Sequence, residues 1–167
     1  MFTSQSSSQS QAQFYLMPKD VNRASNAPKT ALEQVYLLAC QLAERAFTAH
    51  ELVYIHCQDQ QQAYAVDELL WQFEPQSFVP HNLKGEGPLG GAPVEIGFDR
   101  LGANKKRHLL INLADQVPQF AVNFGQIIDF VANDDSHKAI ARDRYRQYRA
   151  LGIALSTQDI ATQPINF

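Results

Sequence analysis

The stretch LVYIHC, residues 52–57, decides the fold class of this 167-residue chain. It is rich in residues that favour strands and nearly continuous in apolar side chains. That pattern is typical of a central strand in a parallel sheet, which is covered on both faces. The stretch therefore predicts an α/β protein.

Segments on both sides of this strand alternate between helical and extended patterns. Thr30 and Glu33 have the spacing of a capping box, and apolar residues follow them at helical intervals. Gly152 stands where a glycine commonly follows the end of a helix. The predicted helices span residues 30–50, 59–72 and 135–151, and the further strands span 12–17, 93–98, 109–113 and 127–131.

This alternation predicts one domain, with a mostly parallel, twisted sheet and helices on both of its faces. The architecture is expected to be Rossmann-like and without a nucleotide site. Residues 1–11 are almost entirely Ser and Gln and are expected to form a disordered tail, and the polar residues 19–29 are expected to form a loop. The domain is expected to span residues 12–155, followed by a C-terminal extension over residues 156–167.

The composition excludes several classes of protein. The formal net charge is −3, whereas a dedicated duplex binder usually has a strong positive balance because it neutralises phosphates. The chain starts with no early Lys or Arg and no apolar run, so no secretory signal is expected. No stretch approaches the roughly 20 apolar residues that span a bilayer. We expect a cytoplasmic protein without a membrane partner.

The run GEGPLG, residues 85–90, satisfies the GxGxxG pattern of dinucleotide sites. In such sites a strand precedes the glycines and a helix follows them, so that the helix N-terminus faces the pyrophosphate. Here Gly91, Ala92 and Pro93 follow, and then a predicted strand. We interpret the run as a turn-rich connection and predict no nucleotide cofactor.

Catalytic and metal-binding patterns are equally weak. The five histidines are dispersed, and no CxxC pair or GxSxG elbow occurs. We therefore predict no catalytic residue, no metal and no cofactor.

The last predicted helix carries a basic stripe, formed by Lys138, Arg142, Tyr145, Arg146 and Arg149 at spacings of three and four. Such a stripe is either a solvated helix face or a local anion site. Only one acid, Asp143, follows Asp135 on this helix, which favours an anion site. Arginine binds carboxylates bidentately, so a carboxylate-rich peptide fits better than a long phosphate track. The residues expected on the buried side are Ile140, Ala141, Tyr148 and Leu151.

A second candidate surface lies in the Pro- and Gly-rich residues 71–96. Large apolar side chains there either anchor an interface or cover the edge of the sheet, and the residue pattern leaves both readings open. These side chains are Trp71, Phe73, Phe78 and Val79.

Three runs in this region, FVPHNL (78–83), GEGP (85–88) and GGAPVEI (90–96), closely resemble the chi subunit of bacterial DNA polymerase III holoenzyme. The resemblance continues in FYL (14–16), DFV (129–131) and the residues around Arg142, Tyr145 and Tyr148. It is collinear over about residues 12–155, and the chain diverges from the family pattern beyond Leu155.

The resemblance implies a non-catalytic replication protein that joins two partners and contacts DNA only indirectly. One partner is the acidic C-terminal tip of the single-stranded DNA-binding protein. The family positions for that site correspond to Lys138, Arg142, Tyr145, Arg146 and Val131. The other partner is the psi subunit of the clamp loader, at Trp71 and Phe78, a surface that the resemblance also links to an iron–sulfur helicase. Two alternatives are a direct single-stranded DNA binder that uses the basic stripe and a nucleotide-dependent enzyme.

Overall fold

A fully parallel sheet of seven strands runs through the computed structural model, which describes residues 9–19 and 30–167. The strands lie in the order β3-β4-β2-β5-β6-β1-β7, and all six neighbouring pairs are parallel. Their bounds are β1 Gln11–Leu16, β2 Val53–His56, β3 His81–Leu83, β4 Val94–Gly97, β5 Leu109–Asn112, β6 Gln126–Val131 and β7 Ala154–Asp159. The parallel α/β fold predicted from the sequence is confirmed.

Capping side chains set where the helices begin. The N-cap residues Thr30, Asp59 and Asp134 each accept a hydrogen bond from the backbone N–H three residues further on. The hydrogen bond from the His137 backbone, with help from its ring, lowers the pKa of Asp134 to about 2, so this cap stays charged at neutral pH. The helices are α1 Ala31–Thr48, α2 Gln60–Gln72 and α3 Asp135–Ala150, with a short 3-10 helix, η1, at Gln119–Asn123.

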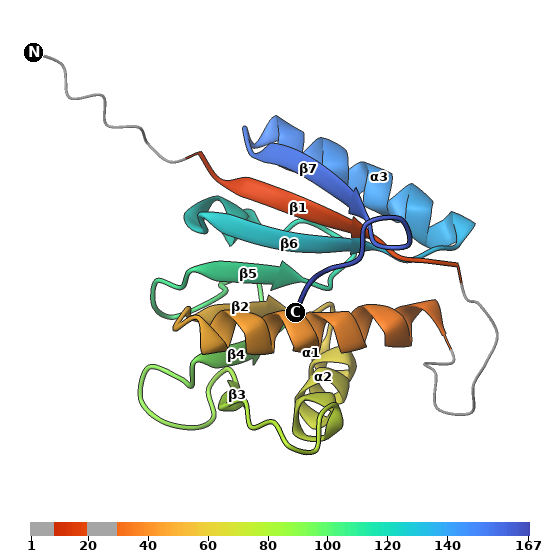
Figure 1. Cartoon of the computed structure of the whole chain (residues 1–167). Coiled ribbons are helices and arrows are strands. Elements are labelled where there is room, and N and C mark those ends of the chain that lie inside the picture. Colours follow the sequence, from red (N-terminus) through yellow and green to blue (C-terminus); the bar gives the residue numbers. More distant parts are fainter. Residues whose placement is uncertain (1–8, 20–29) are drawn as a thin grey trace, which may run out of the picture.

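Helices cover both faces of the sheet, as predicted (Figure 1). Tyr54 and Ile55 are neighbours on β2 and point to opposite faces, because side chains alternate along a strand. Ile55 belongs to the core beneath α1 and α2, whereas Tyr54 belongs to the core beneath η1 and α3. All four residues of β2 are buried, which explains the apolar run at residues 52–57.

The two edge strands, β3 and β7, were not predicted. β3 is only three residues long, and β7 is polar and largely open to solvent, so neither has the apolar pattern of a covered strand. The boundary expected at residue 155 lies inside β7, which pairs with β1 from Ala154 to Asp159. Residues 1–8 of the tail expected at 1–11, and residues 20–29 of the loop expected at 19–29, lie outside the described residues. The expected tail ends too late, because Gln11 is the first residue of β1.

Candidate functional site

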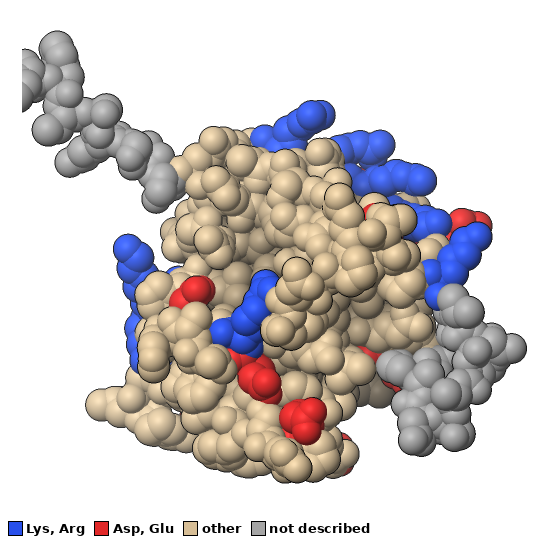
Figure 2. All heavy atoms as spheres, in the orientation of Figure 1, with Lys and Arg blue, Asp and Glu red and all other residues tan. Residues whose placement is uncertain are grey.

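A groove of about 680 Å³ lies between α3 and the neighbouring strands β6, β1 and β7. Phe14 and Val131 contribute apolar lining from the strands, and Ala141 contributes it from the helix. Lys138 and Arg142 stand on the helix side of the groove. Figure 2 shows Lys and Arg side chains gathered over α3, at the upper right of the view. The structure therefore brings together four of the five residues expected at the anion site: Val131, Lys138, Arg142 and Tyr145.

Three cations line the groove, Lys138 and Arg142 from α3 and Lys19 from the segment after β1. Neither Lys138 nor Arg142 forms an ion pair within the described part of the chain. Tyr145 packs its ring against Phe14, with 5.7 Å between the ring centroids. The groove thus combines uncompensated positive charge with an apolar lining.

Two other members of the basic stripe lie outside the groove lining. Arg146 is exposed and pairs with Asp143 at 2.9 Å. Arg149 lies over the Tyr145 ring, with its guanidinium carbon 5.9 Å from the ring centroid. The groove therefore uses only part of the stripe.

The buried side of α3 differs from the expected one. Ala141 and Tyr148 are buried as predicted, but Leu151 is 45% exposed because it follows the last helical residue and sits in the turn toward β7. Ile140 is only partly buried. The third buried residue is Arg144, which the helical pattern alone assigned to no face.

Arg144 is held in a buried polar network that fastens α3 to β6. Its Nη2 atom donates to the Phe130 carbonyl at 2.8 Å, and its Nε atom donates to Asp129. The Tyr148 hydroxyl and the Asn112 amide also donate to Asp129, at 2.7 and 3.2 Å. Burial, reinforced by the charge of Asp129, raises the pKa of Tyr148, so its hydroxyl keeps the donating proton.

The second candidate surface, around Trp71 and Phe78, contains both exposed and buried side chains. Trp71 is 57% exposed and Phe78 is 66% exposed, and their ring centroids lie 6.0 Å apart. The Trp71 ring also packs on His81, at 4.5 Å between centroids. Val79 is buried and Phe73 packs against the main core, so these two side chains support the fold. Trp71 and Phe78 form an exposed aromatic pair beside the β3 edge.

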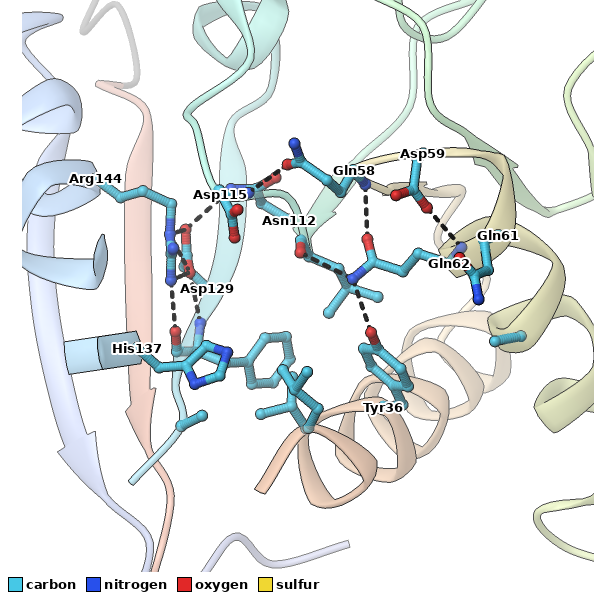
Figure 3. A pocket seen from close by; sticks show the side chains of 16 residues that line it. Tyr36, Gln58, Asp59, Gln61, Gln62, Asn112, Asp115, Asp129, His137 and Arg144 are labelled. Carbon is cyan, nitrogen blue, oxygen red and sulfur yellow. Dashed lines mark hydrogen bonds and ion pairs between the residues drawn. The ribbon is translucent and has the colours of Figure 1, made fainter. Parts of the chain in front are cut away.

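A polar pocket of about 360 Å³ opens at the carboxyl ends of β2, β5 and β6, where open α/β sheets commonly bind ligands (Figure 3). Its polar side chains are largely engaged with one another or with the backbone. The Gln62 amide nitrogen donates to the Tyr36 hydroxyl at 2.9 Å, and the Gln58 amide oxygen accepts from the Asp115 backbone N–H at 2.8 Å. Over residues 9–19 and 30–167, no group of three His, Cys, Asp or Glu is placed to hold a metal ion.

The glycine-rich run joins β3 to β4 without an intervening helix, as predicted for a turn-rich connection. It folds over a buried ion pair in which an Nη2 atom of Arg107 lies 3.7 Å from a carboxylate oxygen of Glu95. Gly91 has φ +80°, and a Cβ there would collide with the Glu95 carboxylate. This packing therefore requires a glycine at position 91. The sequence did not predict the buried ion pair, because Glu95 lies within an apolar strand pattern.

Comparison with known proteins gives close relatives along most of the chain. The chain is 42% identical over 146 residues to the DNA polymerase III subunit chi of Escherichia coli, and the match covers 87% of this chain and 95% of that protein. It is 41% identical over 149 residues to the subunit of the same name from Haemophilus influenzae, covering 89% and 96%.

A solved structure, the crystal structure of T4 UvsW, shares the fold with a TM-score of 0.59 at 9% identity. The match covers 91% of this chain and 42% of that one. None of the helices in the described residues is long and apolar enough to cross a membrane. The family model described as DNA polymerase III chi subunit, HolC, matches residues 10–156. This chain therefore belongs to the DNA polymerase III chi subunit family.

Proposed function

We propose that this chain is a non-catalytic tether in the cytoplasm. It links the clamp loader, through the psi subunit, to the acidic C-terminal tip of the single-stranded DNA-binding protein. The observation that carries the proposal is the groove beside α3, where Lys138 and Arg142 have no ion-pair partner among the described residues.

An acidic peptide complements this groove in two ways. Its carboxylates pair with Lys138 and Arg142, and the arginine fork can hold a carboxylate through two hydrogen bonds. Its apolar side chains contact the lining formed by Leu16, Val131 and Tyr145. A contact of this size is expected to have micromolar affinity, about −8 kcal/mol. Several tips presented by one oligomer raise the effective concentration.

The aromatic pair Trp71 and Phe78 is the proposed contact for psi, and it is also where an iron–sulfur helicase would bind. Exposed aromatic side chains commonly anchor protein interfaces. α2, which carries Trp71, packs on β3 and β4, whereas α3 packs on β6 and β7. Six strand spacings separate the edges of the sheet, about 29 Å at about 4.8 Å each. That distance lets both partners bind at once.

The deciding experiment is a two-partner pull-down with immobilised psi and a labelled acidic-tip peptide. Wild-type protein should retain the peptide on psi resin, whereas Phe78→Ala should remain unbound and Arg142→Ala should bind psi without the peptide. Labelled single-stranded DNA is the competing ligand. If DNA binds more tightly than the peptide and Arg142→Ala abolishes that binding, the chain is a direct DNA binder. The ring packing of Tyr145 on Phe14 opposes that outcome, because it occupies part of the stacking surface.

A further inference from the structure

One wall of the groove comes from residues that lie beyond the family match. The match ends at residue 156, yet Thr157, Asp159 and Ala161 line the groove. This wall lines the same groove as Lys138 and Arg142.

The register of the sheet fixes which side chains of β7 face the groove. Thr157 pairs with Phe14 of β1, and Asp159 pairs with Leu16, and all four residues line the groove. Because side chains alternate along a strand, Ser156 points to the opposite face. Its hydroxyl donates to the Gln13 amide oxygen at 2.7 Å on that face.

The wall is fastened to the domain. Ile160 and Ile165 pack against the core beneath α1, and the Arg45 guanidinium lies over the Phe167 ring at 5.6 Å. At the end of β7, the Asp159 side chain accepts a hydrogen bond from the Ala161 backbone N–H at 2.9 Å. The wall is therefore a fixed part of the groove.

Charge differs between the two sides of the groove. Lys138 and Arg142 are on α3, Asp159 is on β7, and Lys19 follows the end of β1. None of these four side chains is ion-paired within the described residues, and Asp159 is the one acid among the described residues that line the groove. A carboxylate on a bound peptide is attracted to the helix side and repelled from the β7 side.

We propose that Thr157 and Asp159 form a selectivity wall. The wall makes an acidic peptide lie with its carboxylates along α3 and with uncharged residues against β7. The inference rests on the proposed function, since it concerns the same groove, and it assigns specificity to a segment outside the family match.

The test measures binding of a labelled synthetic peptide that carries the acidic C-terminal tip of the single-stranded DNA-binding protein. Thr157→Asp adds a negative charge inside the groove, and Ser156→Asp adds the same charge on the other face of the same strand. At low ionic strength we expect Thr157→Asp to weaken binding by about fivefold and Ser156→Asp by less than about twofold. Asp159→Asn keeps the acceptor for Ala161 and removes the charge, so it should tighten binding by about two- to threefold.

Arg142→Ala separates the failure of this inference from the failure of the proposed function. If Arg142→Ala weakens binding but Thr157→Asp and Ser156→Asp have equal effects, the selectivity wall is overturned and the peptide site stands. If the wild-type protein does not bind the peptide, or Arg142→Ala has no effect, both are overturned. Thermal melts of each variant establish that it is folded before binding is compared.

Discussion

The Arg144 Nε atom lies 3.1 Å from each carboxylate oxygen of Asp129, in the layer between β6 and α3. Asp129 is fully buried and Arg144 is 8% exposed, so each charge depends on the other for compensation. The pair fixes the rotation of α3 about its axis. That rotation turns Lys138, Arg142 and Tyr145 toward the groove.

Replacement of one partner of this pair should destabilise the protein strongly. Arg144→Met leaves a buried carboxylate without its cation, which typically costs about 3–5 kcal/mol. Urea denaturation followed by circular dichroism measures the change in the free energy of unfolding. The double variant Asp129→Leu with Arg144→Met removes both charges and should recover part of the loss. A loss below about 1 kcal/mol for Arg144→Met would contradict this account.

Arg142→Ala should weaken binding of the acidic-tip peptide by roughly ten- to a hundredfold. Loss of a hydrogen bond to a charged group costs about 1.5–3 kcal/mol. Fluorescence anisotropy at several salt concentrations measures the effect, and wild-type affinity should fall as salt rises, since an exposed site is screened over about 8–10 Å. Arg149→Ala is the matched control, because it removes an arginine from the same helix outside the groove lining. Equal losses for the two variants would mean that general charge attraction controls binding.

Phe78→Ala should abolish copurification with psi and leave affinity for the acidic-tip peptide within about twofold, or about 0.5 kcal/mol. Truncation of an aromatic interface anchor costs about 2 kcal/mol or more. Phe78 is largely exposed, so the variant should melt at nearly the wild-type temperature. Phe73→Ala is the contrasting variant, since Phe73 packs against the core and its loss should lower the melting temperature. If folded Phe78→Ala loses both partners, the two sites are not independent.

His56 should make stability depend on pH. Burial lowers its pKa from 6.5 to about 4, with the Asp99 charge opposing the shift. Between these values the unfolded chain binds a proton that the folded chain does not, so stability falls as pH drops from about 6.5 to 4. His56 alone contributes about 3 kcal/mol to this fall. Thermal melts at pH 7 and pH 4.5 should show a smaller drop for His56→Leu than for wild type, and equal drops would refute the assignment.

Gly91→Ala and Gly85→Ala should differ in cost although both glycines have positive φ. An added Cβ at Gly85 meets no atom within 4 Å, so Ala there costs only backbone strain, about 1–2 kcal/mol. At Gly91 the Cβ displaces the buried Glu95 carboxylate from its pairing with Arg107. We expect Gly91→Ala to be less stable than Gly85→Ala by at least about 2 kcal/mol. Chemical denaturation of the two variants tests the difference, and equal stabilities would exclude a packing role for Gly91.

The covered strands could be predicted from the sequence because a strand that is buried on both faces is a nearly continuous run of apolar residues. β2, β5 and β6 all carry such runs, and the helix starts are marked by capping residues. β7 has no such apolar run, since its residues are mostly polar and it joins the sheet mainly through backbone pairing with β1. Because backbone pairing is independent of side-chain type, the sequence of β7 does not show that it is a strand. Most of β7 was therefore assigned to a C-terminal extension.

The two cations that α3 contributes to the groove, Lys138 and Arg142, could be predicted from helical spacing, and the resemblance supplied Val131. The opposite wall could not be predicted, because it required the pairing of β7 with β1. Arg144 was likewise hidden, since an arginine in a basic helix is expected in solvent, and its buried partner Asp129 is distant in sequence.

The parallel sheet also has a mechanical consequence. Under the proposed function, the two partners pull at right angles to the strands, so the ladders between them carry the load in series. The β5–β6 ladder, like β3–β4, has three residue pairs, fewer than the six of β1–β6 or β1–β7. The Asn112–Asp129 hydrogen bond crosses this short ladder and acts as a side-chain clamp. The buried network that orients α3 thus also reinforces one of the two shortest strand pairings of the sheet.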